Sequence, residues 1–198
     1  MSKTIVPLFS DVVYINEIVI DPINLDNIQY IKNAGNLVSD SIDILDQTEF
    51  QNLRISISNC LHDFFYNELK ADNTIGIRIT DSWINKSTSG SYHHQHNHSN
   101  SIFSGVVFLE YNDPGNSGRI KFQSSKHKVL DFDVYEQNIL NSTSYAVVPK
   151  KGKILIFPSE LLHSVEEYKS NTPRISLSFN TFLTGRISDI KTRSLKLN

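Results

Sequence analysis

The hydrophobic pattern of this chain changes near residue 74, and that change limits the folds that the chain can adopt. After this point apolar and polar residues alternate in several short runs, of which RISLSFNTF (174–182) is the clearest. A period of two is typical of β-strands with one buried face. The preceding residues carry apolar side chains at helical spacing instead. Helices followed by strands predict an α+β protein, in which N-terminal helices support a β-sandwich or small barrel.

Two helices are expected in the first part of the chain. Helical spacing predicts a long one over residues 47–69, with an apolar face made of Phe50, Leu53, Ile57, Cys60, Leu61, Phe64 and Phe65. A second helix is expected over about 22–34, between the turn signal Asp21-Pro22 and Gly35. The run VVYINEIVI (12–20) predicts one strand or two short ones before it.

The predicted strands after residue 74 are separated by clear turn signals. SIFSGVVFLEY (101–111) and RIKFQ (119–123) flank NDPGNSG, a pattern that predicts a β-hairpin. KILIF (153–157) predicts a short buried strand that ends at Pro158. Residues 124–146 are polar with scattered aromatic side chains, and we expect a long loop or an irregular strand pair there.

The composition argues against a nucleic-acid interface and a membrane span. The 198 residues are 39% hydrophobic and 20% charged, as in an ordinary globular domain, and the net charge is −2. No apolar run reaches the roughly 20 residues of a transmembrane helix, and the N-terminus lacks the apolar core of a signal peptide. Cys60 is the only cysteine, which suits a reducing compartment. We expect a soluble, cytoplasmic single domain with Cys60 buried as a small apolar group.

Four histidines lie within six residues in HHQHNH (93–98). On a strand, residues two apart face the same way, so His94, His96 and His98 would share one face and His93 would point away. Any adjacent pair of the three could hold a metal ion. Neutral imidazole suits zinc, copper, iron and nickel, so the ligand type leaves the metal open.

A third ligand has to come from another part of the chain. His163 is the best candidate, because it follows the predicted strand that ends at Pro158 by five residues. His62, inside the long predicted helix, and His127, in the variable loop, rank lower.

The strand that begins at Arg174 has one polar and one apolar face. Its polar face would carry Arg174, Ser176, Ser178 and Asn180, and such a face either meets solvent or lines a cavity. The planar guanidinium of Arg174 suits a carboxylate ligand. Ser176, two residues on, can donate a further hydrogen bond to the same group.

Two segments, SWINKSTSGSYHHQHNHSNSIFSGVVFLEY and KGKILIFPSELLHSVEEYKSNTPRISLSFN, together resemble the 2-oxoglutarate- and Fe(II)-dependent oxygenases. The similarity is greatest to the small prolyl-hydroxylase-like members found in bacteria and phages. The combination of HxH before SGVVFL, FPSxLxH and RISxSFN is specific, whereas no single piece would be. The resemblance implies one oxygenase domain over 1–198. Its double-stranded β-helix core (jelly-roll, cupin-like) would span 73–185, with mainly helical support at 1–72 and a tail at 186–198.

The resemblance also implies a site and a reaction. His96 and His98 would be the paired Fe(II) ligands and His163 the distal ligand, which favours this pair over His94 and His96. Arg174 would anchor the C5 carboxylate of 2-oxoglutarate, assisted by Ser176. With dioxygen, such an enzyme hydroxylates a protein side chain or small molecule and releases succinate and CO2. A phage-encoded protein of this kind would work in the cytoplasm of the host cell.

One position departs from the usual pattern of this family. The common site holds two histidines and one carboxylate, whereas here His98 occupies the position of the carboxylate. A neutral ligand leaves the site more positive by one charge, which is expected to alter metal preference. His94 remains an alternative partner for the ligand pair.

Two other functions are compatible with the same residues. A non-catalytic cupin-like module would bind metal or ligand without turnover. A zinc hydrolase would need a general base near the metal, but Glu160 and Glu166, which flank His163, are expected to face solvent.

The sequence leaves the substrate open and gives only a few candidates for its contacts. Candidate pocket residues are Trp83, Tyr92, Ser104 and Asn180, and the aromatic residues Phe132, Tyr135 and Tyr145 make the loop at 124–146 a candidate substrate selector. An exposed sheet edge could pair two copies into a homodimer.

Overall fold

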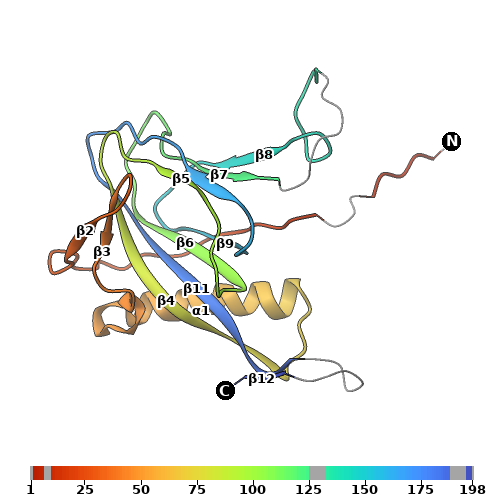
Figure 1. The fold of residues 1–198 in the computed structure, drawn as a ribbon, viewed down its shortest axis with the longest axis horizontal. Helices are drawn as coiled ribbons and strands as arrows, with labels where there is room; N and C mark the ends of the chain where they lie inside the picture. The colour runs from red at the N-terminus through yellow and green to blue at the C-terminus, as the bar shows by residue number, and fades with distance from the viewer. Residues whose placement is uncertain (1, 7–9, 125–132, 188–194, 198) are drawn as a thin grey trace.

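The computed structural model describes residues 2–6, 10–124, 133–187 and 195–197, which form two antiparallel sheets and a helical segment (Figure 1). The larger sheet has the strand order β1-β9-β6-β11-β4-β3-β2, with β12 paired to β11. Its strands are β1 (Tyr14–Glu17), β2 (Tyr30–Lys32), β3 (Leu37–Ser39), β4 (Ile75–Ser87), β6 (Phe103–Glu110), β9 (Lys153–Pro158), β11 (Arg174–Ile187) and β12 (Leu195–Leu197).

The smaller sheet has the strand order β5-β10-β7-β8. Its strands are β5 (His93–His96), β7 (Ile120–Gln123), β8 (Ser144–Val147) and β10 (His163–Val165). Between Phe103 and Val165 the chain alternates between the sheets, since β6 and β9 belong to the larger one and β7 and β10 to the smaller one. This arrangement is the jelly-roll, or double-stranded β-helix, that the resemblance implies.

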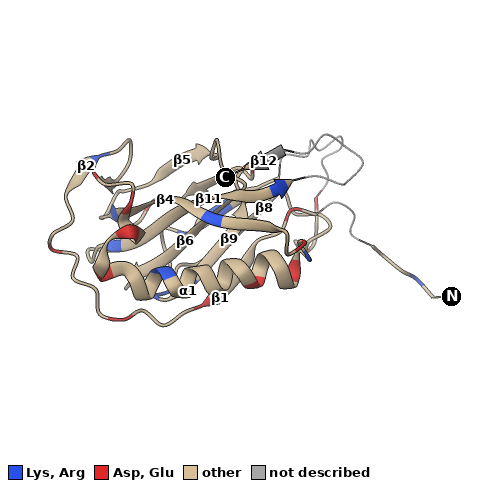
Figure 2. Ribbon diagram, turned by 90° about the horizontal axis from the view of Figure 1, so that it is seen from below, with Lys and Arg blue, Asp and Glu red and all other residues tan. Residues whose placement is uncertain are grey.

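A helical segment covers the outer face of the larger sheet (Figure 2). It consists of the 3₁₀ turns Ile44–Asp46 and Thr48–Phe50, the α-helix α1 (Gln51–His62) and a wider π-helical end, Asp63–Glu68. The long predicted helix over 47–69 is therefore confirmed, and its apolar face packs in the core against strands β6, β9 and β11. Cys60, in this core, is a buried free thiol, as expected.

Strand alternation divides the apolar side chains of the larger sheet between two cores. On β9, Ile154 and Ile156 pack toward the helix, whereas Leu155 and Phe157 pack toward the smaller sheet. Strand β11 uses its alternation differently. Its apolar side chains Ile175, Leu177 and Phe179 join the helix-side core, so its polar face is turned to the space between the sheets.

The predicted helix over 22–34 is wrong. Residues 22–29 are irregular, and β2 and β3 then form a hairpin that extends the larger sheet. The side chains of Asn24 and Asn33 accept hydrogen bonds from the backbone N–H groups of Asp26 and Ala34. Such local bonds compete with helical ones, so a turn-forming sequence outweighs the helical signals.

The predicted hairpin between 101–111 and 119–123 is also wrong. β6 belongs to the larger sheet and β7 to the smaller one, so the turn between them crosses from one sheet to the other. The Asp113 carboxylate stabilises this turn by accepting from the backbone N–H groups of Gly115 and Ser117. A turn motif predicts a reversal of the chain, but the apolar faces of the two strands decide which sheet each one joins.

The structure describes both ends of the candidate selector loop and parts of the expected tail. Residues 125–132, which include His127 and Phe132, lie outside the described residues. Tyr135 and Tyr145 are exposed, and the chain returns to regular structure at β8. Leu195–Leu197 pair with β11, so this part of the expected tail is a strand. Within the described ranges, no helix has the length and hydrophobicity that a membrane crossing requires.

Truncation of Ile57 tests the packing of α1 on the sheet. Ile57 is fully buried, and Ile57→Ala should lower the free energy of unfolding by about 2–5 kcal/mol, because the methyl groups leave a cavity. Ile55 lies on the same helix and is 58% exposed, so Ile55→Ala is the matched control and should change stability by less than about 0.5 kcal/mol. Urea unfolding measures both. Equal losses for the two variants would contradict the described packing.

Candidate active site

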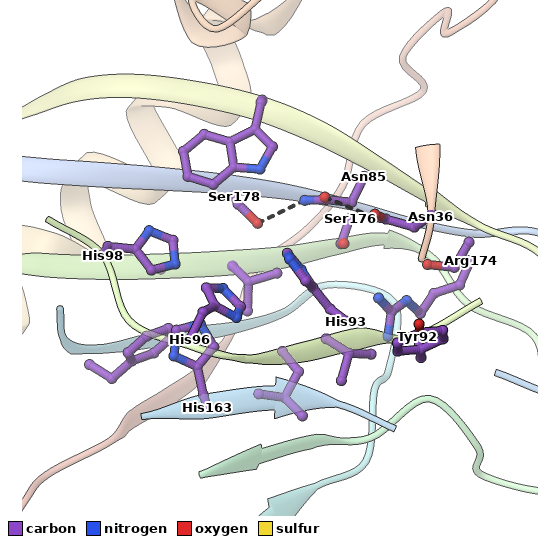
Figure 3. Close-up of a pocket in the computed structure, with 17 residues that line it drawn as sticks. Asn36, Asn85, Tyr92, His93, His96, His98, His163, Arg174, Ser176 and Ser178 are labelled. Carbon is purple, nitrogen blue, oxygen red and sulfur yellow. Dashed lines mark hydrogen bonds between the residues drawn. The ribbon is translucent and has the colours of Figure 1, made fainter. Parts of the chain in front are cut away.

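Three of the predicted histidines come together between the sheets (Figure 3). His96 ends β5 and pairs with His163, the first residue of β10, while His98 lies two residues beyond β5. One ring nitrogen from each of the three lies within 4.8 Å of the others. His96, His98 and His163, the predicted combination, therefore lie close enough together to hold one metal ion.

Each of the three rings is held by a hydrogen bond from its Nδ1 atom. The Nδ1 atoms of His96 and His163 lie 2.9 Å from the backbone oxygens of His94 and Leu161, respectively. The Nδ1 atom of His98 lies 2.8 Å from the side-chain oxygen of Asn180. Because these oxygens only accept, each Nδ1 carries the hydrogen and each Nε2 keeps a free lone pair. This is the arrangement of metal-binding histidines in proteins.

Burial keeps the three imidazoles in the neutral form that binds metals. It lowers the pKa of His163 from 6.5 to about 3, helped by the neighbouring His96 and His98. Burial is also the main cause that lowers the pKa of His96 and of His98. At neutral pH, a metal ion therefore does not have to displace protons from these rings.

A β-bulge changes which histidines face the site. His163 pairs with His96 and Val165 with His93, so three residue steps on β5 lie opposite two on β10. His93 therefore points inward, lines the pocket and stacks on His96 with ring centroids 4.2 Å apart. His94 is exposed and lies outside the cluster. The expectation that His94 shares the inner face and His93 points away is wrong, because regular strand parity ends at the bulge.

Arg174 lies at the other end of the same pocket (Figure 3). Its side chain is buried, and its Nη1 donates to the backbone oxygen of Gly118 at 2.6 Å. Among the described residues, its Nε has no hydrogen-bond partner and no carboxylate forms an ion pair with it. Burial lowers its pKa to about 10, which still leaves it charged at neutral pH. A buried cation without a counter-ion favours an anionic ligand in this pocket.

The polar face of β11 continues from Arg174 along the pocket wall. Ser176 and Ser178 line the pocket, as does Asn85 on β4, which donates to Ser178 at 3.0 Å. Asn36, in the loop between β2 and β3, donates to Asn85 at 3.1 Å, and its own buried Oδ1 has no partner in the described part of the chain. Asn36 is not among the residues predicted from the sequence, because it follows the wrongly predicted helix over 22–34.

The loop that carries Asn36 is held tightly against the site. The Gly35 carbonyl accepts from the N–H of Tyr92, which lines the pocket. A Cβ at Gly35 would lie 2.3 Å from the Tyr92 carbonyl oxygen, so a larger residue would force the loop away. Among the other candidate lining residues, Trp83 lines the pocket. Asn180 instead contacts His98 through a hydrogen bond, and Ser104 contacts Asn180.

The remaining candidates lie apart from the site. His62 packs edge-on against Tyr66 at the end of α1. Glu166 forms an exposed ion pair with Arg119, and Glu160 is exposed, as expected. Neither carboxylate lines the pocket, so neither is the general base that a zinc hydrolase would need.

Comparison with known proteins agrees with this fold. Residues 81–180, half of the chain, match the family model described as "Putative 2OG-Fe(II) oxygenase". The chain therefore belongs to the 2OG-Fe(II) oxygenase family. No curated protein has a sequence that matches it.

Several solved structures share the fold at low sequence identity. An oxidoreductase of the 2OG-Fe(II) oxygenase family from Burkholderia pseudomallei has a TM-score of 0.57 and 13% identity, over 78% of this chain and 72% of its own. The non-heme alpha-ketoglutarate-dependent epimerase SnoN from nogalamycin biosynthesis has a TM-score of 0.58 and 13% identity, over 84% and 73%. A Pseudomonas putida prolyl-4-hydroxylase has a TM-score of 0.51 and 13% identity, over 78% of both chains.

The buried imidazoles predict that the metal-free protein loses stability in mild acid. Unfolded histidine titrates near pH 6.5, whereas burial lowers the pKa of His93 to about 4 and that of His163 to about 3. Below pH 6.5 the unfolded state therefore binds more protons than the folded state. In the presence of a chelator, the free energy of unfolding should fall as the pH drops from about 6.5 toward 4.

His163→Gln should make this pH dependence shallower, because one buried imidazole is removed. The matched control, His62→Gln, removes an exposed imidazole and should keep the wild-type slope. Urea unfolding at pH 7, 6, 5 and 4.5 provides the comparison. A wild-type slope in the His163→Gln variant would contradict the assignment of His163 as buried and neutral.

Proposed function

We propose that this chain is an Fe(II)- and 2-oxoglutarate-dependent dioxygenase, which hydroxylates a protein side chain or a small molecule and releases succinate and CO2. Arg174 carries the proposal, because it is a buried cation without a counter-ion among the described residues, and it lines the pocket that holds three metal-competent imidazoles. A dicarboxylate bound to the metal at one end and to Arg174 at the other would satisfy both features.

His96, His98 and His163 would hold the metal ion through their Nε2 atoms. Three protein ligands would leave coordination positions on the ion free for the cosubstrate and dioxygen. Bound iron with 2-oxoglutarate would supply the activation of dioxygen, a reaction that belongs to the cofactor and cosubstrate. The protein contributes the fixed tautomer of each ring, which the hydrogen bond at Nδ1 selects.

Arg174 and Ser176 would bind the C5 carboxylate of 2-oxoglutarate. The Nε of Arg174 is an unused donor, while the Gly118 carbonyl holds its Nη1 and fixes the plane of the guanidinium. Ser176 lies on the same face of β11, is 2% exposed and lines the same pocket. Both groups are therefore positioned before the ligand arrives, which limits the ordering cost of binding.

The alternative is a cupin-like module that binds metal and ligand without turnover. Family membership supports an oxygenase instead. Expected interaction partners are the small-molecule or protein substrate, while a homodimer through an exposed sheet edge stays a prediction. We also propose that residues 1–198 form a single domain with an N-terminal supporting part, a β-helix core and a tail.

The function is tested by loading the protein with Fe(II) without oxygen and then adding air and 2-oxoglutarate. We expect succinate formation and oxygen consumption that both require 2-oxoglutarate, even at the slow uncoupled rate without the hydroxylated substrate. Screening peptides and metabolites for faster succinate release then identifies the substrate class. Tight binding of Fe(II) and 2-oxoglutarate without any succinate would support the cupin-like module instead.

Arg174→Ala should weaken 2-oxoglutarate binding by about 30-fold or more, because it removes the buried partner of a carboxylate. The matched control is Arg119→Ala, since Arg119 is exposed and pairs with Glu166 outside this pocket. Isothermal titration calorimetry of the Fe(II)-loaded protein measures both affinities, and a retained unfolding midpoint shows that each variant is folded. Unchanged affinity in Arg174→Ala would remove Arg174 from the binding site.

A further inference from the structure

His98 differs from the other two histidines in what holds its Nδ1 hydrogen. His96 and His163 donate to backbone oxygens, whereas His98 donates to the side chain of Asn180 on β11. Asn180 in turn donates from its Nδ2 to the Asp81 carboxylate on β4 at 2.6 Å. A carboxylate therefore lies one amide away from the ring that takes the place of the usual carboxylate ligand.

Strand pairing places these side chains in one row across the larger sheet. Asn180 is paired with Asp81 on one side and with Ser104 on the other. The Ser104 hydroxyl lies 2.7 Å from the Asn180 Oδ1, which also accepts from His98. The stack of Trp83 on His98, with ring centroids 5.8 Å apart, covers the ring itself. The row is therefore held by backbone pairing on both sides of β11.

The donor and acceptor properties of Asp81, Asn180 and His98 fix the direction of both hydrogen bonds in this row. An ionised carboxylate only accepts hydrogen bonds, so the amide of Asn180 has to turn its NH₂ group toward Asp81. Its oxygen then faces His98, and the His98 Nδ1 has to be the donor. The charge of Asp81 thus selects the tautomer in which the Nε2 of His98 has a free lone pair.

We propose that Asp81 and Asn180 are positioning residues of the metal site. They fix His98 in its Nδ1–H tautomer, and they link its ring through hydrogen bonds to a carboxylate, a group that is missing from the metal ligands themselves. This inference rests on the proposed function, because it takes His98 as a metal ligand. A carboxylate linked to a ligating imidazole raises the basicity of that ligand, and loss of such outer partners typically weakens metal binding by 10–100-fold.

Asp81→Asn separates the charge from the hydrogen bond. The new side chain can still accept from Asn180, but it also offers a donor, so the amide of Asn180 can turn over and the second tautomer of His98 becomes allowed. We expect the affinity for Fe(II), measured without oxygen by competition with a chromophoric chelator, to fall about tenfold. Co(II) provides a second probe with its own absorption spectrum.

A double variant, Asp81→Asn with Asn180→Asp, restores the row with the charge moved closer. The amide introduced at position 81 donates to the carboxylate introduced at position 180, and that carboxylate accepts from His98. We expect the Fe(II) affinity of this variant to equal or exceed that of the wild type. If Asp81 and Asn180 acted only through sheet packing, the double variant would combine two packing defects and would bind Fe(II) no better than Asp81→Asn.

The tautomer of His98 gives a readout that needs neither metal nor activity. In metal-free protein labelled with ¹⁵N, long-range ¹H–¹⁵N correlation spectra should show His98 as the Nδ1–H tautomer in the wild type and in the double variant. Asp81→Asn should show a mixture of both tautomers. The matched control is Asp72→Asn, since the Asp72 carboxylate accepts hydrogen bonds from Thr74 in the turn before β4, and it should leave spectra and affinity unchanged.

The outcomes separate this inference from the proposed function. Failure of the wild type to bind Fe(II) would overturn the metal site and the proposed function together. Wild-type binding with unchanged affinity and tautomer in Asp81→Asn would overturn only the role of Asp81. Weaker binding in Asp81→Asn without rescue in the double variant would also overturn it, because geometry and not charge would then explain the loss.

Discussion

The burial of the Arg174 charge is the constraint on which the rest of this structure depends. A guanidinium without a carboxylate partner is costly between two sheets, and here it is tolerated because the Gly118 carbonyl and the ring of Phe108 lie against it. Strand β11 holds the residue rigidly, since β4 and β6 pair with it on both sides. The same strand turns its apolar face to the helix-side core. The fold thus holds a buried guanidinium in a fixed position on the pocket wall.

The metal-competent cluster depends on the meeting of the two sheets. His96 and His163 come from paired strands of the smaller sheet, while the ring of His98 is oriented from the larger sheet by Asn180. The cluster would therefore lose its geometry if the sheets moved apart. Because its imidazoles are neutral, they do not repel one another by charge in the metal-free state. Their burial lowers their pKa values and makes the folded protein sensitive to acid.

Much of the site could be predicted from the sequence, because alternation on β11 and the spacing of the family motifs are local signals. The polar face from Arg174 to Ser178 lines the pocket as that alternation allows. The exchange of His93 for His94 could not be predicted, because a bulge in β5 depends on the register with β10. The crossing between β6 and β7 and the hairpin of β2 and β3 likewise depend on tertiary packing, which overrides local turn and helix signals.

The contact between Gly35 and Tyr92 has a consequence for how this pocket can diverge among relatives. Asn36 forms part of the pocket wall from the β2–β3 loop, yet it lies outside the segment 81–180 that defines the family. Two proteins could share residues 81–180 in full and still differ in the part of the pocket wall that Asn36 forms, because the residues before that segment can be unrelated. Exchange of the first forty residues between relatives would then change this part of the pocket wall, while residues 81–180, which carry the three histidines and Arg174, stay unaltered.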